Sequence, residues 1–290
     1  MPYALSNGIK LYYEEVGNGF PIIFVHEFGS DLREWEQQLR YFSRDYRCVA
    51  FNARGYTPSE VSENPEDYGY EFSVDDILNL MKNLKINQAH IVGLSMGAYA
   101  SLIFGIKYSE MVASLVIAGV GSGAMPKDRK SFINMANDLA DIFEKEGSAQ
   151  AAKIIGNSGS RLQLLRKDPR AYKQFLDHLE EHSATGSSLT MRQYQALRPS
   201  LIDFEEEFIK MDIPTLLMVG DEDELCLDIN IYLKRKIKTS GLWIYPQTGH
   251  AINLEEPSQF NSVISMFLSK VERGSWKERL PESFKDINNN

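Results

Sequence analysis

The stretch AHIVGLSMG, residues 89–97, decides the fold of this 290-residue chain. Its first six residues form a short apolar run that is typical of a buried strand, and the small and apolar residues of 96–108 predict a helix. Ser95 therefore stands on a sharp turn between a strand and a helix, flanked by Gly93 and Gly97 in a G-x-S-x-G pattern. Such a nucleophile elbow lifts the serine hydroxyl out of the sheet, at the positive end of the following helix.

Short apolar runs alternate with helical patterns on both sides of this elbow. Ser73 is expected to cap a helix that begins at 74, and the turn residues 17–19 predict a hairpin between the strands 9–16 and 22–25. Strands that alternate with helices predict a mostly parallel sheet with helices on both faces. The expected strands are 9–16, 22–25, 47–51, 89–94, 112–118, 213–219 and 242–245, and the expected helices outside the middle region are 74–84, 96–108, 228–238 and 257–271.

The middle region, residues 122–212, reads as one helix after another, rich in charge and methionine and without a strand-like run. We interpret it as an all-helical cap inserted into an α/β core. The predicted organisation is a core of residues 1–121 and 213–275, a cap of 122–212, and a polar C-terminal tail of 276–290 that is loosely held.

A serine needs a base within hydrogen-bonding reach to become a nucleophile at neutral pH. His250 is the best candidate, because it follows the last expected strand and so falls where the carboxyl ends of parallel strands host ligands. The acid that orients it should follow the preceding strand, where Asp221 to Glu224 supply four carboxylates. Asp223 is preferred, because the two residues past Asp221 leave room to turn back, and Asp221 is the alternative.

These motifs together resemble the α/β-hydrolase family over residues 9–120 and 213–270. The resemblance implies a triad of Ser95, Asp223 and His250. The segment 249–257 also resembles the family's histidine loop, and 52–59 resembles its D-x-R-G-x-G-x-S loop, from which Asn52 and Thr57 depart.

His26-Glu27-Phe28-Gly29 resembles the family's H-G-x-G oxyanion loop. The resemblance implies that the backbone N–H groups of Phe28 and Met96 stabilise the developing oxyanion, an effect for which loss of one donor typically costs about 3 kcal/mol. Glu27 departs from the pattern, and a carboxylate there would oppose negative charge, so we expect its side chain to point away from Ser95. If it points inward, Glu27, with His26 beside it, becomes a possible substrate contact that binds a basic group or positions water.

Two other motifs suggest ligands that the rest of the chain does not support. His178 and His182 fit H-x-x-E-H, a zinc-peptidase pattern, but no nearby residue suggests a third zinc ligand. A solvated helix face explains residues 178–182 better. Residues 119–124 fit G-x-G-x-x-A, yet they lead into the cap and not directly into a helix, so a flexible neck explains these glycines better than dinucleotide binding. No cofactor and no metal are expected.

The composition excludes several classes of protein. With 43% hydrophobic and 24% charged residues the chain can bury a full core, and its net charge of −9 disfavours nucleic-acid and anionic-membrane partners. Cys48 and Cys226 form no disulfide or zinc pattern, and no signal peptide or membrane-spanning run is visible. The expectation is a soluble cytoplasmic monomer or homodimer acting on a small molecule.

Three functions remain open. The first is hydrolysis of a small or medium carboxylic ester under the cap, whose residues 132, 135, 143, 191 and 194 are candidates for an apolar pocket. The second is cleavage of a carbon–carbon bond, lactone or amide on the same triad. Ala251 disfavours the carbon–carbon case, because relatives that cleave such bonds often carry an aromatic residue after the histidine. The third is a non-catalytic receptor for a small molecule on the same scaffold.

Overall fold

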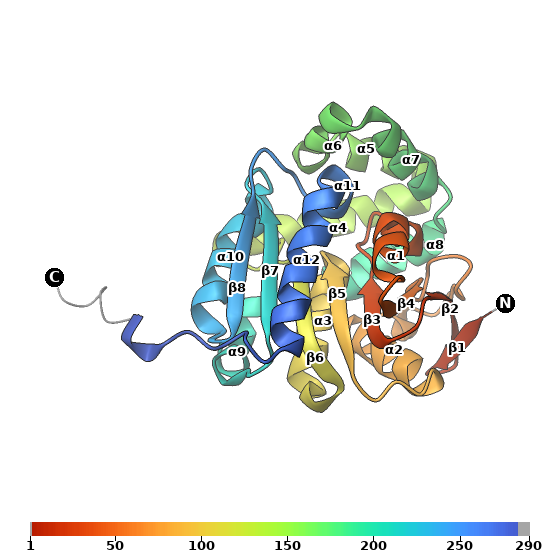
Figure 1. The fold of residues 1–290 in the computed structure, drawn as a ribbon. Helices are drawn as coiled ribbons and strands as arrows, with labels where there is room; N and C mark the ends of the chain where they lie inside the picture. The colour runs from red at the N-terminus through yellow and green to blue at the C-terminus, as the bar shows by residue number, and fades with distance from the viewer. Residues whose placement is uncertain (1, 284–290) are drawn as a thin grey trace.

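A computed structural model describes residues 2–283. It contains an eight-stranded sheet in the order β1-β2-β4-β3-β5-β6-β7-β8 (Figure 1). The strands are β1 (Tyr3–Ser6), β2 (Ile9–Val16), β3 (Phe20–Val25), β4 (Tyr46–Phe51), β5 (Ala89–Leu94), β6 (Val112–Ala118), β7 (Thr215–Gly220) and β8 (Ser240–Tyr245). The seven expected strands are confirmed, and β1 is the one that the sequence patterns did not predict.

The pairing of β2 differs from the prediction. We expected β2 and β3 to form a hairpin across Gly17-Asn18-Gly19, but β4 lies between them. β2 pairs antiparallel with β1 and β4, whereas β3 pairs parallel with β4 and β5. Turn residues specify that the chain reverses, yet they do not specify which strand becomes the neighbour. Across the part of the sheet that runs β4-β3-β5-β6-β7-β8, every pair of neighbouring strands is parallel.

Alternate residues of the central strands pack into two separate cores, as the period of two along a strand requires. One core contains Ile23, Val25 and Ile91 and is covered by α2 (Tyr70–Asn83), α3 (Met96–Lys107) and α10 (Glu224–Lys236). The other contains Ile22 and Phe24 and is covered by α1 (Glu36–Phe42) and α12 (Pro257–Glu272). Helices therefore cover both faces of the sheet, as predicted.

The start of α2 is the second correction. This helix begins at Tyr70 after Gly69, and Ser73 lies inside its first turn. The Ser73 hydroxyl donates to the Gly69 carbonyl and does not accept from a helix N–H, as an N-cap would. The apolar positions expected to face the core do so: Val74, Ile77, Leu80 and Met81 are fully buried.

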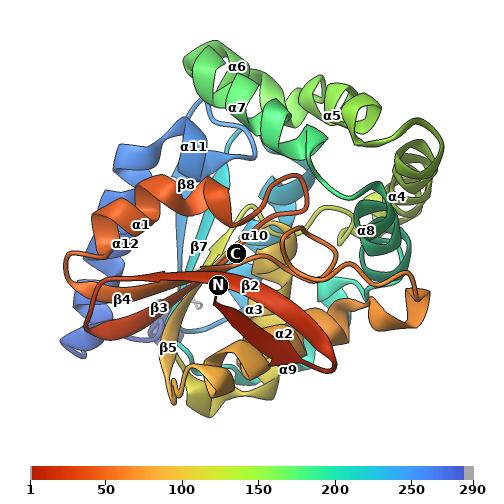
Figure 2. The same cartoon turned by 90° about the vertical axis from the view of Figure 1, so that its right-hand side faces the viewer.

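Residues 122–212, here called the helical segment, contain no strand. They form α4 (Pro126–Glu146), α5 (Ser148–Gly156), α6 (Leu162–Lys167), α7 (Pro169–Glu180), α8 (Ala184–Leu189), the π-helical η5 (Thr190–Gln195) and α9 (Glu205–Lys210), with short 3₁₀ turns between them. In both ribbon views α5, α6 and α7 lie beyond one end of the sheet (Figures 1 and 2).

The chain after α12 is held more firmly than expected as far as the structure describes it. Trp276 packs edge-on against Phe267 with ring centroids 4.7 Å apart, and its indole N–H donates to Thr239 O at 2.7 Å. The rest of the predicted tail, residues 284–290, lies outside the described residues. Within residues 2–283, no helix is both long enough and apolar enough to cross a membrane.

Candidate active site

Ser95 occupies the predicted elbow between β5 and α3. Its φ of 53° is a left-handed conformation that non-glycine residues adopt only at a steric cost. The Ser95 N–H donates to Ala118 O of the neighbouring β6 at 2.8 Å, which fixes the turn. A Cβ atom at Gly97 would collide with the carbonyl groups of Val25 and His26, and one at Gly93 would collide with the first turn of α3. Gly97 is thus required by the close approach of α3 to the end of β3, and Gly93 by the close approach of α3 to β5.

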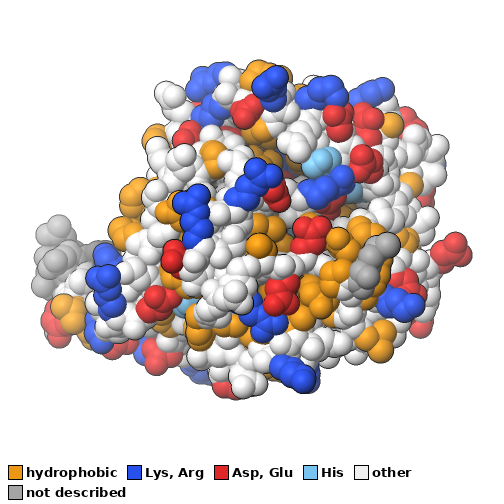
Figure 3. All heavy atoms as spheres, turned by 45° about the vertical axis from the view of Figure 1, so that its right-hand side comes forward, with side chains coloured by type: hydrophobic (Ala, Val, Ile, Leu, Met, Phe, Trp, Pro, Cys, Tyr) orange, Lys and Arg blue, Asp and Glu red, His pale blue; other side chains and the backbone are white. Residues whose placement is uncertain are grey.

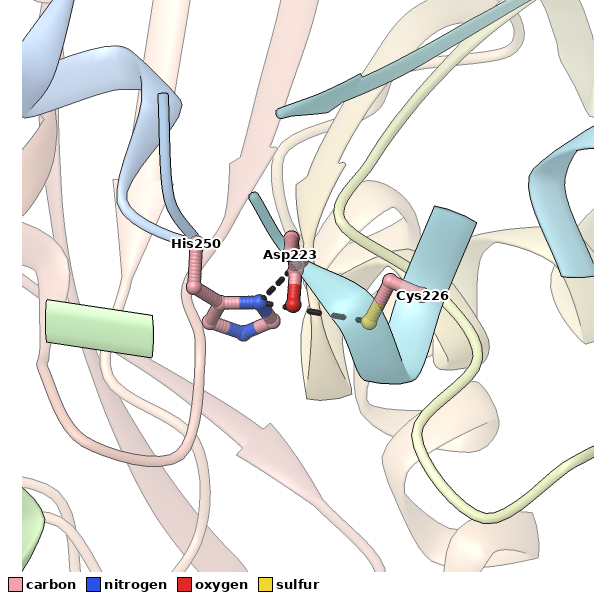
Figure 4. Close-up of side chains that lie close together, drawn as sticks. All are labelled: Asp223, Cys226 and His250. Atoms are coloured by element: carbon pink, nitrogen blue, oxygen red, sulfur yellow. Dashed lines mark hydrogen bonds and ion pairs between the residues drawn. The ribbon is translucent and has the colours of Figure 1, made fainter. Parts of the chain in front are cut away.

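His250 and Asp223 form the hydrogen-bonded pair that the sequence predicted. Asp223 lies at the N-terminus of α10, just after β7, and His250 lies on the loop after β8 (Figure 4). The Nδ1 atom of His250 lies 2.6 Å from Oδ2 of Asp223. The alternative acid, Asp221, instead accepts from Thr248 N at 3.1 Å. The geometry therefore favours Asp223 over Asp221 as the partner of the imidazole.

The electrostatics of this pair favour a protonated ring. Burial lowers the pKa of His250, but the negative charge of Asp223 and its hydrogen bond outweigh burial and hold that pKa well above the ordinary value. His250 is only 7% exposed, so water screens this attraction weakly.

Cys226 is a neighbour that the sequence analysis did not place in the site. Its Sγ lies 4.0 Å from Nδ1 of His250 and 3.3 Å from the Gly119 carbonyl oxygen (Figure 4). Ligand atoms of Cys226, Asp223 and His250 lie within 4.8 Å of one another, the one such group among the described residues. Tetrahedral zinc at usual bond lengths would separate its nitrogen and oxygen ligands by about 3.3 Å. The observed 2.6 Å is a hydrogen bond, so this arrangement fits the imidazole–carboxylate pair better than a metal site.

A cavity of about 600 Å³ joins these residues to the helical segment. Ser95, Asp223 and His250 all line it. Within residues 2–283 the Ser95 hydroxyl forms no hydrogen bond with His250. Of the five apolar residues expected to form a pocket, Phe132, Met135 and Met191 line the cavity, whereas Phe143 and Tyr194 are buried in the core beside it.

Phe28 and Met96 occupy the positions expected of oxyanion donors. Phe28 lines the cavity from the loop after β3, and Met96 is the first residue of α3. Neither backbone N–H has a hydrogen-bond partner in the part of the chain that the structure describes. Two unpaired amide donors beside the elbow are suited to receive a developing negative charge.

The expectation that Glu27 points away from the site is wrong. Its carboxylate lines the cavity, and Oε2 lies 3.7 Å from Nε2 of His250. The physical reason is Arg161 of the helical segment, in the 3₁₀ turn η4 (Gly159–Arg161), whose guanidinium binds both carboxylate oxygens of Glu27. Burial raises the pKa of Glu27, but Arg161 and then His250 outweigh it, so the carboxyl remains ionised.

Behind Glu27 lies a second buried acid, Glu34, in the 3₁₀ turn η1 (Leu32–Trp35). The Glu27 N–H donates to its Oε1 at 3.0 Å, while its Oε2 has no partner within residues 2–283. Burial and the nearby charge of Glu27 raise the pKa of Glu34 well above its usual range. The raised pKa of Glu34 favours its protonated form and leaves Glu27 as the ion-pair partner of Arg161.

His26 does not fit the expected role of a substrate contact. It is buried, and both ring nitrogens are used by the backbone: Nδ1–H donates to Glu27 O at 2.6 Å, and Nε2 accepts from Ala53 N at 2.9 Å. Burial lowers its pKa to about 4, so the ring is neutral. His26 instead holds the oxyanion loop against the loop after β4.

The two alternative ligand motifs are explained by packing. His182 is buried, with its ring 5.1 Å from that of Tyr56, so the prediction of a solvated helix face is wrong for this residue. No metal-ligand cluster among residues 2–283 includes His182 or His178. In the glycine motif, Gly121 has a φ of 122°, and a Cβ there would overlap Ile229 of α10, so close packing explains this glycine.

Comparison with known proteins places this site in a family. The family model described as the alpha/beta hydrolase fold matches residues 21–257. The chain is 27% identical over 269 residues to the AB hydrolase superfamily protein YisY of Bacillus subtilis, covering 89% of this chain and 95% of that protein. It is 24% identical to 3-oxoadipate enol-lactonase 1 of Acinetobacter baylyi over 258 residues, covering 88% of this chain and 91% of the lactonase.

Solved structures share the same fold. A thermophilic esterase from Thermogutta terrifontis superimposes with a TM-score of 0.82 at 23% identity, over 93% of this chain and 98% of the esterase. The enol-lactonase from Burkholderia xenovorans LB400 gives a TM-score of 0.81 at 21% identity, over 92% of this chain and all of that chain. Since the family model spans most of the sheet and the whole of the elbow, the chain belongs to the α/β hydrolase fold family of enzymes.

Proposed function

We propose that this protein hydrolyses a small or medium carboxylic ester through an acyl-enzyme on Ser95. The observation that carries the proposal is the 2.6 Å hydrogen bond between Asp223 and His250, at a cavity that Ser95 enters from a left-handed elbow. A serine, an imidazole and a buried carboxylate in this order are the groups that nucleophilic acyl transfer needs.

In the proposed reaction, Nε2 of His250 takes the Ser95 proton as the hydroxyl attacks the ester carbonyl. Asp223 holds the Nδ1–H tautomer and stabilises the imidazolium that forms. The oxyanion accepts from the N–H groups of Phe28 and Met96, and His250 then protonates the departing alcohol. Water activated by His250 releases the acid. Catalytic hydrogen bonds are often long in free enzymes and shorten when substrate binds, so we expect the Ser95–His250 bond to form in the complex.

Glu27 is compatible with this chemistry because Arg161 neutralises it. An ionised carboxylate alone near an oxyanion would oppose the developing charge, but the bidentate ion pair leaves little net charge. Its 3.7 Å approach to Nε2 of His250 stabilises the imidazolium form of the ring. We therefore assign Glu27 a positioning role toward His250, and Arg161 the role of holding Glu27 in place.

A small-molecule substrate fits the surface as well as the site. On the face drawn in Figure 3, basic side chains are interspersed with acidic ones and do not gather into one stripe, as a nucleic-acid backbone would require. The helical segment supplies Phe132, Met135 and Met191 to the cavity wall, and we propose that it acts as a cap which forms the substrate pocket.

The test is labelling with a fluorophosphonate probe, which reacts covalently with activated serines. Intact protein should be labelled, and Ser95→Ala should not, whereas Ser262→Ala on the surface of α12 is the matched control and should label like the intact protein. Equal labelling of Ser95→Ala and intact protein would refute the proposed nucleophile.

A lactone is the second candidate substrate, because a lactone is an internal ester. One relative, which matches this chain over 91% of its own length, is named an enol-lactonase. The test measures kcat/KM for a panel of acyl esters and lactones of equal carbon number, with intact protein and with Ser95→Ala. The values for intact protein show which of the two substrate classes is preferred. A ligand that raises the melting temperature of the protein without any turnover would instead favour a receptor.

A further inference from the structure

Arg198 is a buried cation on the wall of the same cavity. It lies just after η5 in the helical segment and is 5% exposed. Its Nη2 donates to Ser122 O at 3.0 Å. The guanidinium stacks between two aromatic rings, with its central carbon 4.7 Å from the centroid of Tyr99 and 5.1 Å from that of Phe132. A rigid guanidinium held in this way is ordered before any ligand arrives.

No carboxylate compensates this charge. Among residues 2–283 no Asp or Glu oxygen lies within 4.0 Å of the Arg198 side chain. Three other buried or half-buried arginines do have acidic partners: Arg54 pairs with Asp76, Arg161 with Glu27, and Arg192 with Asp141 and Glu144. Arg129 donates to the Arg198 carbonyl and so brings a second cation to the same place.

A buried charge without a partner is unfavourable, and proteins rarely retain one without a use. Burial and the repulsion from Arg129 lower the pKa of Arg198, but a guanidinium remains charged at neutral pH. A guanidinium has five N–H donors. Ser122 O takes one of them, and the Tyr194 hydroxyl is a second partner. The remaining donors suit a planar anion such as a carboxylate, which arginine binds in a bidentate manner.

The neighbours of Arg198 locate it near the nucleophile. Tyr99, which stacks on it, lies one helical turn after Ser95 and donates its N–H to Ser95 O at 3.0 Å. Ser122, which accepts from it, also contacts Cys226 beside the His250–Asp223 pair, with Oγ and Sγ 3.3 Å apart. One small molecule in a cavity of about 600 Å³ can therefore approach Ser95 and Arg198 together.

The other charges on the cavity wall do not compete for an anion. Glu27 is paired with Arg161, Asp223 is paired with His250, and Asp138 is an exposed residue of α4. Arg198 is thus the one cation of this wall, within the described residues, that has no acidic partner.

We propose that Arg198 binds an anionic group of the substrate, so that the natural substrate is an ester that also carries a free carboxylate. The proposal rests on the proposed ester hydrolysis at Ser95 and adds the substrate class. The carboxylate binds Arg198 while Ser95 attacks the ester carbonyl of the same molecule.

The test compares two substrates that differ only in charge: mono-p-nitrophenyl glutarate, and the same compound with its free carboxylate methylated. Release of p-nitrophenol measures hydrolysis of the aryl ester in both compounds. For intact protein we expect kcat/KM to be at least about tenfold higher for the acid, the gain typical of a charge-assisted hydrogen bond. Arg198→Met should bring the ratio to about one, and Arg198→Lys should keep part of the preference. Arg192→Met, whose arginine is paired and lies outside the cavity, should keep all of it.

A preference of the intact protein for the methylated compound, or an equal kcat/KM for both, would overturn the proposal. Calorimetry on Ser95→Ala separates this failure from failure of the proposed function, because binding needs no turnover and no change at Arg198. If intact protein hydrolyses neither ester but Ser95→Ala binds the acid about tenfold more tightly, the anion site stands and the proposed function falls. If Ser95→Ala binds both compounds equally, the anion site falls.

Discussion

The cavity has two walls of different origin. The wall formed by the sheet contributes residues that follow the carboxyl ends of its strands, Ser95 after β5 and Asp223 after β7 among them. The wall formed by the helical segment contributes Arg161, Arg198 and apolar side chains such as Met135. In the proposed reaction the first wall holds the groups that move protons and form bonds, whereas the second holds fixed cations and apolar surface.

This difference between the two walls predicts which kinetic or stability parameter a substitution in each wall should change. In the proposed reaction, residues of the sheet wall act on the reacting atoms, so their replacement should lower kcat. Residues of the helical wall act on a bound molecule or on a neighbouring side chain, so their replacement should change KM, substrate preference or stability. The predictions below test this division.

The largest effect is expected from Asp223→Asn. An amide in place of the carboxylate favours the wrong tautomer of His250 and removes the charge that stabilises the imidazolium, so kcat should fall about 10³- to 10⁴-fold. Ester hydrolysis under saturating substrate measures it. Asp221→Asn is the matched control, because that carboxylate accepts from Thr248 N and should leave kcat within about threefold. Equal losses in the two variants would refute the assignment of the acid.

The next effect concerns stability. Arg161→Met leaves the buried Glu27 carboxylate without its partner, and breaking a buried ion pair from one side typically costs about 3–5 kcal/mol. Urea unfolding should show this loss. The double variant Arg161→Met/Glu27→Gln should recover part of it, since no buried charge remains. Arg192→Met, which breaks a more exposed pair, should cost less than about 1 kcal/mol.

A smaller effect is a change in pH dependence. His250 must be neutral to act as a base, and its pKa lies above the ordinary value, so kcat/KM should rise as pH increases through that raised pKa. Glu27→Gln removes a negative charge 3.7 Å from Nε2, which disfavours the protonated ring and should move the acidic limb to lower pH by about half to one unit.

Glu34→Gln is the control for this shift. The raised pKa of Glu34 favours its neutral form, so an amide there should change the local charge less than Glu27→Gln does, and the acidic limb should move less. A limb that moves equally in both variants would show that Glu27 does not act through its charge.

The smallest effect is expected on the helical wall. Met135 lines the cavity but is 42% exposed, so Met135→Ala should change stability little. It should raise KM by about two- to tenfold for an apolar acyl ester, with kcat unchanged, because it removes apolar contact with bound substrate. A fall in kcat with KM unchanged would contradict the division between the two walls.

The sheet wall could be predicted from the sequence, because strand patterns are local and the order of serine, acid and histidine fixes which strand each residue follows. Within the loop after β7, Asp223 was preferred because the two residues past Asp221 leave room to turn back, and Asp223 does contact His250. The helical wall could not be predicted in this way. The direction of Glu27 depends on Arg161, which lies 134 residues further along the chain, and no local pattern signals that contact.

The same reason explains the incorrect hairpin and the missed Cys226. A turn at 17–19 is visible locally, but the insertion of β4 between β2 and β3 depends on the whole sheet. Cys226 reaches His250 because α10 begins at Glu224 with Asp223 as its N-cap, a boundary that the sequence patterns placed four residues later. The lack of an acidic partner at Arg198 is visible only in three dimensions.

One hydrogen bond fastens the helical wall to the helix that carries the elbow. The Tyr194 hydroxyl of η5 donates to Met96 O at 2.9 Å, in the first turn of the helix that carries the elbow. The helical wall is therefore fastened directly to the helix that positions Ser95, and a displacement of η5 would be felt at the elbow through this bond.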